Sequence, residues 1–116
     1  MFQLHSRLAE DSIVIGRFDL SLLLLSKDAN YPWCILVPQV EDVFEIHHLS
    51  EEEQMQLMRE SCRLSEVMTS VFDAHKMNVA ALGNVVRQLH VHHIARFEED
   101  PAWPQPIWGK LPATSY

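Results

Sequence analysis

Glycine, cysteine and long apolar runs are scarce in this chain of 116 residues. With three glycines, two cysteines and no internal repeat, the sequence indicates neither a repeat architecture nor a disulfide framework. No apolar run reaches the roughly 18 residues that a membrane-spanning helix needs, so we expect no membrane partner. The N-terminal segment lacks the basic end and apolar run of an export signal. These absences predict a cytoplasmic protein in which Cys34 and Cys62 are reduced thiols.

Basic residues are also few. Nine Lys and Arg stand against sixteen Asp and Glu, which gives a formal net charge of −7, and no basic cluster offsets it locally. The release of counterions that drives binding to nucleic acid polymers is therefore missing, and we expect no such partner. A small anionic substrate remains compatible with this charge, because a few donors focused in a pocket act over short distances.

The apolar fraction, 47% of the residues, is that of an ordinary globular protein, and the length indicates a single domain over residues 1–116. Residues 12–18 and 20–25 are short apolar runs separated by Asp19, which predicts two strands joined by a tight connection. The continuous apolar run of residues 33–37 predicts a third strand buried on both faces. Residues 38–49 have mixed character and predict a loop.

A long helix is expected after this loop. Ser50 precedes three glutamates, which places Glu53 at the third helical position of a capping box and puts negative charge at the helix N-terminus. Apolar residues then recur at helical spacing as far as about His75. We expect this broad stripe to belong to the core; its members are Met55, Leu57, Met58, Cys62, Leu64, Met68, Val71 and Phe72.

Two more strands are predicted after the helix, over residues 77–82 and 88–95. A few strands, one long helix and two further strands indicate an α+β fold, with an antiparallel sheet of about five strands backed on one face by the helix. From residue 98 to residue 116 the sequence holds four of its six prolines and two of its three tryptophans. We expect an extended tail there that is neither helix nor central strand.

The run "QLHVHHI", residues 88–94, concentrates the chemistry of the chain. Side chains alternate along a strand, so Gln88, His90 and His92 are expected on one face and His93 among the apolar residues of the other. A His-x-His pair supplies only two of the ligands that zinc needs, and Glu98 or Glu99 would have to fold back to complete the set. We therefore expect no metal site.

The longer segment "GNVVRQLHVHHIAR", residues 83–96, resembles the signature of the histidine triad (HIT) family, which is His-x-His-x-His followed by two apolar residues. In this resemblance His90 and His92 stand at the second and third histidines, and Gln88 stands at the first. Gly83 and Asn84 are similar to the Gly-Gln pair of the family. Val85 occupies a place that is usually Ser or Thr.

The resemblance extends beyond this signature. Asn78 is similar to the asparagine that opens the preceding strand of the family, and Arg96 follows the histidines as it does in many members. The upstream segment "SKDANYPWCILVPQVED" is similar to the strand on the nucleoside side, with Trp33 and Cys34 in place of a Gly-His pair. By position, Ser26, Lys27 and Asp28 are candidates for the ribose pocket.

The resemblance implies a mechanism for this sequence. A neutral imidazole is a good nucleophile, and the His90 ring would attack the α-phosphorus of a nucleotide to give a nucleotidyl-histidine that water then cleaves. His92 and Asn84 would donate hydrogen bonds to phosphate oxygens. No cofactor is required, although Mg²⁺ can arrive with a polyphosphate substrate. Glutamine at position 88 cannot carry a proton, so turnover that is slow or altered is compatible with the sequence.

The implied activity is hydrolysis of a nucleoside phosphoanhydride or phosphoramidate, with diadenosine polyphosphates as a substrate class. Two alternatives stay open: a nucleotide-binding module with little turnover, and a nucleotidyl transferase. Family resemblance also implies a homodimer formed through the long helix and the strand that leads from Asn78. The tail residues Trp103, Ile107 and Trp108 would add apolar area that a monomer exposes.

Overall fold

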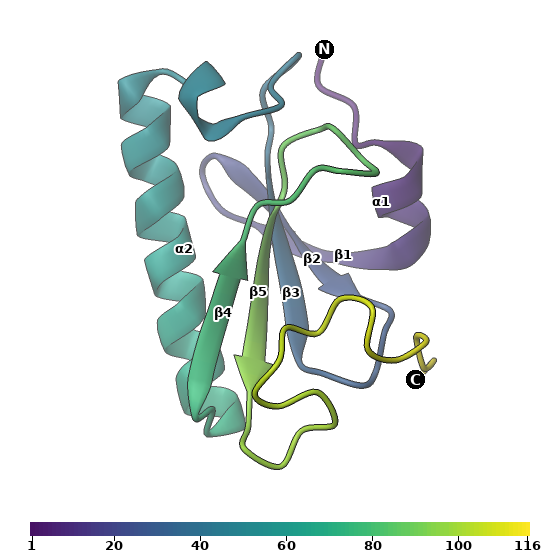
Figure 1. The fold of residues 1–116 in the computed structure, drawn as a ribbon. Helices are drawn as coiled ribbons and strands as arrows, with labels where there is room; N and C mark the ends of the chain where they lie inside the picture. Colours follow the sequence, from purple (N-terminus) through teal and green to yellow (C-terminus); the bar gives the residue numbers. More distant parts are fainter.

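The computed structural model describes residues 1–116 and contains a five-stranded antiparallel sheet with one long helix on one of its faces (Figure 1). The strand order is β1-β2-β3-β5-β4, so β1 and β4 are the edges. The strands are β1 (Ser12–Arg17), β2 (Ser21–Ser26), β3 (Trp33–Pro38), β4 (Lys76–Ala80) and β5 (Val91–Arg96). The helices are α1 (Ser6–Asp11), the short η1 (Ile46–His48) and α2 (Glu51–Phe72). The predicted α+β fold is confirmed, and none of the helices has the length and apolar character needed to cross a membrane.

The start of the histidine strand differs from the prediction. β5 begins at Val91, opposite Leu36, and its pairing with β3 ends there although β3 continues to Pro38. Residues 84–90 form a loop instead, and the Leu89 amide donates to the Val43 carbonyl of another loop. Strict alternation of side chains therefore holds from Val91 onward and does not extend to Gln88. Helix α1 and the short η1 were not predicted.

Helix α2 begins and ends as capping chemistry requires. The Ser50 side chain accepts from the Glu53 amide at 3.1 Å, and the Glu53 carboxylate accepts from the Ser50 amide at 2.9 Å, so the predicted capping box is confirmed. At the C-terminal end Asp73 adopts the left-handed conformation, with φ of 53°, which stops the helix before His75.

Only one side of the apolar stripe of α2 belongs to the core. Leu57, Leu64 and Met68 are buried against the sheet. The prediction that the whole stripe is core was wrong, because a second set of its residues faces outward. This exposed set comprises Met55, Met58, Cys62, Val71 and Phe72.

A buried carboxylate ties α2 to the first hairpin. Glu60 is only 3% exposed, and its two oxygens accept from the Leu20 amide at 2.8 Å and the Ser21 amide at 3.1 Å. Gln56, one turn earlier on the helix, donates to the same carboxylate at 2.8 Å. A charged group can be buried here because each oxygen has donors in place of water. The contact fixes the helix along the sheet.

The opposite face of the sheet is covered by α1, the loop after β4 and the C-terminal tail (Figure 1). Leu8 of α1 and Val86 of the loop pack on Leu24 and Ile35 of the sheet. In the tail, which contains no helix or strand, Ala102 and Ile107 are buried against Tyr31 and Ile94. The expectation that Ile107 offers apolar area to another molecule was therefore wrong, because its own sheet already covers it.

His93 lies on the helix side of β5, as the alternation predicted. Its ring is fully buried; Nδ1 bonds to the Val91 carbonyl at 3.1 Å and Nε2 to the Ser61 hydroxyl of α2 at 2.7 Å. Because a carbonyl only accepts, Nδ1 carries the proton and Nε2 accepts from Ser61. The ring is a structural link between β5 and α2.

We predict that His93→Ala lowers the free energy of unfolding by about 2–4 kcal/mol, because it leaves a cavity and an unpaired Ser61 hydroxyl. Urea unfolding followed by circular dichroism measures this change. Ser61→Ala, which removes only the hydroxyl partner, should destabilise less, and His75→Ala at an exposed histidine should have little effect. Equal stability of the His93→Ala and His75→Ala variants would contradict this role.

Candidate functional site

Two of the three clustered histidines, His90 and His92, line a cavity of about 410 Å³ on the face of the sheet opposite α2. We call it the histidine cavity. Its walls come from α1, from the strands β2 and β3, from the loop after β4 and from the tail. The lining residues are Arg7, Leu8, Asp11, Ser26, Trp33, Ile35, Leu82, Gly83, Asn84, Val85, Val86, His90, His92 and Trp108.

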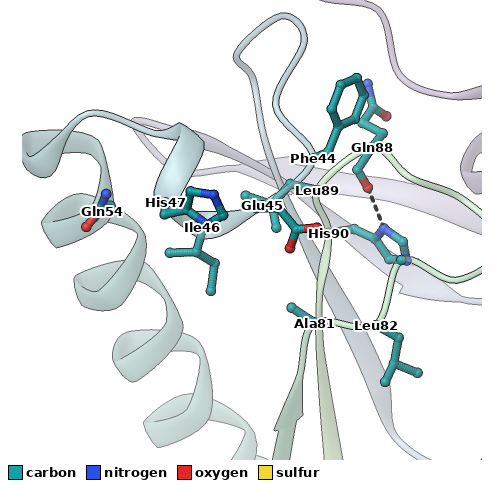
Figure 2. Close-up of a pocket in the computed structure, with 11 residues that line it drawn as sticks. Phe44, Glu45, Ile46, His47, Gln54, Ala81, Leu82, Gln88, Leu89 and His90 are labelled. Atoms are coloured by element: carbon teal, nitrogen blue, oxygen red, sulfur yellow. Dashed lines mark hydrogen bonds between the residues drawn. The ribbon is translucent and has the colours of Figure 1, made fainter.

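The His90 ring is oriented by the main chain. Its Nδ1 lies 2.7 Å from the carbonyl oxygen of Gln88 (Figure 2). A carbonyl oxygen can only accept, so in the neutral ring Nδ1 carries the proton and Nε2 keeps its lone pair. No group of the chain bonds to Nε2, and the residue lines the histidine cavity. His90 therefore presents an unprotonated ring nitrogen to any ligand bound there.

His90 also borders a second cavity. Figure 2 shows this space, of about 370 Å³, between the loop around Glu45, the start of α2 and the segment from Gln88 to His90. We call it the loop cavity. The exposed residue His47 lines it as well. A ligand that reaches His90 therefore has space on two sides of the ring.

His92 is the neighbour of His90 on the same side of the sheet. The ring centroids lie 4.9 Å apart at an interplanar angle of 78°. The Trp33 indole N–H donates to Nδ1 of His92 at 3.0 Å. Burial, and to a smaller extent the nearby rings of His90 and His93, lowers the pKa of His92 from 6.5 to about 4. His92 is therefore a neutral ring at neutral pH.

Gln88 does not take part through its side chain. Its Oε1 accepts from the His5 amide at 2.8 Å, and its Nε2 donates to the Gln3 carbonyl at 2.9 Å. The side chain thus holds the N-terminal segment in place, and only the backbone carbonyl bonds to the ring of His90. The expected catalytic contribution of the Gln88 side chain is corrected to a main-chain contact.

The loop after β4 brings Gly83 and Asn84 to the cavity. Gly83 has φ of 74°, a conformation that glycine adopts without strain, and both residues line the cavity with His90. Val85 lines it too, although its side chain is largely exposed. The loop thus places an amide side chain and several backbone groups across from the histidines.

Ser26, Lys27 and Asp28 are divided between two spaces. Ser26 lines the histidine cavity, whereas Lys27 and Asp28 line an adjoining cavity of about 510 Å³ beside the tail. The Asp28 carboxylate accepts from the backbone amides of Asn30 and Thr114, so it is engaged in fixing the tail. Of the three candidates for a ribose contact, Ser26 alone lines the histidine cavity.

Arg96 and Asn78 are not at the cavity. Arg96 is 1% exposed; it donates to Asn78 Oδ1 at 2.7 Å and to the Asp100 carboxylate at 2.8 and 3.0 Å. Burial would raise the pKa of Asp100, but hydrogen bonds from Arg96 and from the amides of Phe97 and Ala102 lower it to about 2. The expected substrate contact is corrected: Arg96 forms a buried ion pair with Asp100 that anchors the tail, and Asn78 accepts a further hydrogen bond from Arg96.

Four polar or aromatic residues of the cavity were not assigned to the site from sequence. Arg7 and Asp11 come from α1, a helix too short to give a periodic signal. Trp33 could be placed from the register of β3 against β5, in which it pairs with Ile94, next to His92 on the same face. Trp108 reaches the cavity only because the tail folds back, which no local pattern indicates.

The side chains around the cavity form no ready set of metal ligands. No group of three or more His, Cys, Asp and Glu side chains is positioned to hold an ion. Glu98, one of the two carboxylates considered as further ligands, lies instead 3.9 Å from His75 Nδ1.

Comparison with known proteins identifies the family. A sequence profile described as the HIT domain matches residues 7–99. The chain belongs to the HIT family. This match spans all of α1 except Ser6, the whole sheet, α2 and the segment that carries both cavity histidines. A search of curated proteins found no match.

Solved structures of HIT proteins have the same fold. A histidine triad protein from Bradyrhizobium japonicum is 50% identical with a TM-score of 0.98, covering 99% of this chain and 86% of its own. A histidine triad protein from Marinobacter aquaeolei is 53% identical with a TM-score of 0.98, covering 100% of this chain and 85% of its own. A histidine triad protein from Sinorhizobium meliloti is 43% identical with a TM-score of 0.97, and the alignment covers 99% of this chain and 85% of that protein.

The two buried histidines predict how the stability of this HIT protein depends on pH. Burial lowers the pKa of His92 and of His93 from 6.5 to about 4. Between these two pH values the unfolded chain binds more protons than the folded chain. The contribution of the two rings to the free energy of unfolding is therefore fully present above pH 6.5 and is lost as the pH falls towards 4. Each ring contributes a slope of at most about 1.4 kcal/mol per pH unit.

Urea unfolding from pH 7 to pH 4 measures this slope. We expect His92→Asn to reduce it, because one of the two rings with a lowered pKa is gone. The same slope in the wild type and the His92→Asn variant would show that the buried ring does not titrate as described.

Proposed function

We propose that this HIT protein is a nucleotide hydrolase that uses Nε2 of His90 as its nucleophile. The bond between His90 Nδ1 and the Gln88 carbonyl carries this proposal, because it fixes the ring in the tautomer whose free lone pair faces the cavity. HIT proteins include nucleotide hydrolases and transferases, and family membership supports the same chemistry. The substrate class is a nucleoside phosphoanhydride or phosphoramidate, such as a diadenosine polyphosphate.

The reaction has two displacements at phosphorus. The Nε2 lone pair forms a bond to the α-phosphorus while the bond from phosphorus to the leaving oxygen or nitrogen breaks, and its electrons go to the leaving group. Positive charge develops on the His90 ring, and the Nδ1–H bond to the Gln88 carbonyl strengthens accordingly. Water then attacks phosphorus and releases a proton to the solvent, the bond to Nε2 breaks, and the electron pair of that bond returns to the ring as its lone pair.

The histidine cavity has the size and the walls that a nucleotide needs. Its volume of about 410 Å³ lies within the range of small-molecule sites. Leu8, Ile35 and Val86 give it an apolar wall for a base. Arg7 and Asn84 add donors for phosphate oxygens, and Ser26 adds a hydroxyl near the same space. No cofactor is needed in this scheme, and Mg²⁺ enters only as a companion of a polyphosphate.

The Gln88 contact also bears on the glutamine that the HIT resemblance places at the first triad position. The atom that orients His90 is a main-chain carbonyl, which every residue type provides. A glutamine there is therefore compatible with a nucleophilic His90. This supports turnover over binding alone.

We predict that His90→Ala lowers the release of AMP from diadenosine tetraphosphate by more than about 10³-fold, because the nucleophile is lost. His92→Ala should lower it by about 10²-fold through loss of a hydrogen-bond donor. Chromatography of the products measures both rates. His75→Ala, at an exposed histidine outside the cavity, serves as the control and should retain the wild-type rate.

The same assay separates the alternatives. Binding of the substrate without release of AMP would identify a nucleotide-binding module, and transfer of the adenylyl group to added phosphate would identify a transferase. Mass spectrometry of quenched wild-type protein should detect an adenylyl adduct on His90. Activity should survive EDTA once Mg²⁺ is restored; a specific requirement for Zn²⁺ would overturn the metal-free scheme.

We further propose that the protein is a homodimer that pairs through α2 and the neighbouring edge strand β4 (Figure 1). The exposed stripe of α2 supports this, because Met55, Met58, Cys62 and Phe72 recur at spacings of three, four and ten residues along one side of the helix. Val79 of β4 is 50% exposed as well. A contact between identical surfaces is the commonest way to cover such a stripe.

We predict that Met58→Glu yields a monomer, because a charge in the middle of the stripe would be buried without a partner. Light scattering at micromolar concentration gives the mass, with Ser70→Glu on another side of α2 as the matched control that stays dimeric. Cys62 lies near the centre of the stripe, so an antiparallel helix pair brings two Cys62 thiols together. A short thiol cross-linker should therefore capture wild-type dimers and not Cys62→Ser. A monomeric wild type would contradict the proposal.

A further inference from the structure

We propose that Trp33 is a positioning residue, which holds His92 as a neutral ring whose Nε2–H points into the histidine cavity. The inference rests on the proposed function for its catalytic meaning, since His92 would donate to phosphate there. Its structural part rests on the hydrogen bond of 3.0 Å from the Trp33 indole to His92 Nδ1. The indole nitrogen is a donor with no acceptor capacity.

The direction of this bond decides the tautomer. Because the indole N–H must donate, Nδ1 of His92 must present its lone pair, and the proton of the neutral ring lies on Nε2. Nε2 bonds to no other group of the chain and is not among the fully buried unpaired atoms. It is therefore open to the histidine cavity.

The two cavity histidines thus carry complementary tautomers. His90 has its proton on Nδ1, bound to the Gln88 carbonyl, and offers a lone pair from Nε2. His92 has its lone pair on Nδ1, bound to Trp33, and offers a proton from Nε2. In each case the partner is a group of fixed polarity, so neither ring can exchange roles without breaking its bond. The pair supplies one nucleophile and one donor.

Packing holds the bond in place. The ring centroids of Trp33 and His92 are 5.5 Å apart, and Trp108 of the tail lies 5.2 Å from His92 and 6.2 Å from Trp33. His92 is 7% exposed between these two indoles. Trp108 makes only ring contacts with His92, whereas Trp33 also donates the hydrogen bond. Trp33 alone is therefore placed to select the tautomer.

The same bond opposes the charged form of His92. A protonated imidazole carries hydrogens on both nitrogens, so the Trp33 N–H would lose its acceptor and meet another donor. The titratable groups around the ring are His90 on the same segment, Arg7 and Asp11 of α1 across the cavity, and His93 behind it. Burial is the largest cause of the lowered pKa of His92, and the indole bond acts in the same direction.

Cys34 cannot perform this task. In the HIT resemblance, Trp33 and Cys34 together replace a Gly-His pair. Cys34 is paired with His93 in the sheet and packs in the core under α2, on the far side from the cavity. Of the two residues, Trp33 is the one whose polar atom reaches the histidines.

Nuclear magnetic resonance of the full-length wild-type protein, labelled with ¹⁵N in histidine and tryptophan, tests the structural part without any variant. We expect the His92 Nδ1 signal to be that of an unprotonated nitrogen from pH 8 to below pH 6. We also expect a scalar coupling across the hydrogen bond between Trp33 Nε1 and His92 Nδ1. A protonated Nδ1 at pH 7 would overturn the inference.

Trp33→Phe tests the positioning role, because it removes the N–H and keeps an aromatic ring. We expect the coupling to vanish, the pKa of His92 to rise towards 6.5, and kcat for AMP release at pH 7 to fall about tenfold with little change in KM. Trp108→Phe is the matched control for the resonance measurement and should leave the His92 tautomer unchanged. Circular dichroism and the His90 signals verify the fold.

The outcomes separate this inference from the proposed function. An unprotonated Nδ1 in a protein that releases no AMP would support the tautomer and overturn hydrolysis. Release of AMP at an unchanged kcat and with an unchanged His92 pKa in the Trp33→Phe variant would overturn the role of Trp33 and leave His90 as the nucleophile.

Discussion

The structure depends on the burial of β5 on both faces. All six residues from Val91 to Arg96 are buried, and three of them are polar or basic. A buried polar side chain is tolerated when its hydrogen-bonding groups have partners, so His92, His93 and Arg96 each require one. These partners are supplied by three different parts of the chain: Trp33 of β3, Ser61 of α2 and Asp100 of the tail. The central strand therefore organises the layers around it.

Because side chains alternate along β5, His93 on one face stabilises the fold and His92 on the other face lines the cavity. His93 points to α2, where its ring links sheet and helix. His92 points to the opposite face, where its partner leaves one nitrogen open to the cavity. Neighbouring histidines thus acquire different tasks because the sheet has two faces. His90 lies just before the strand, and its orientation comes from the preceding loop.

The cavity is assembled from segments that are distant in sequence. Helix α1, the loop after β4 and Trp108 of the tail close over the histidines on the side that α2 leaves free. The side chain of Gln88 contributes indirectly, because its two bonds to the N-terminal segment hold the chain that leads into α1. A residue at a signature position thus acts on the site through its backbone and on the fold through its side chain.

The sequence alone determined the features that depend on local chemistry. Ser50 and Glu53 specify the start of α2, and the apolar run from Trp33 specifies a strand buried on both faces. The spacing of His90, His92 and His93 and the glycine-led segment before them indicated the HIT family and the separation of His93 from the other two. Each of these signals lies within a few residues, where capping, alternation and helical periodicity act.

Tertiary structure decided what depends on partners far along the chain. Arg96 and Asn78 became a buried anchor because the tail returns with Asp100, and the apolar stripe of α2 divided because the sheet covers only one side of the helix. Local periodicity shows that a side chain is apolar and cannot show which surface covers it. The tautomers of His90 and His92 were likewise decided only when the fold placed a carbonyl beside one ring and an indole N–H beside the other.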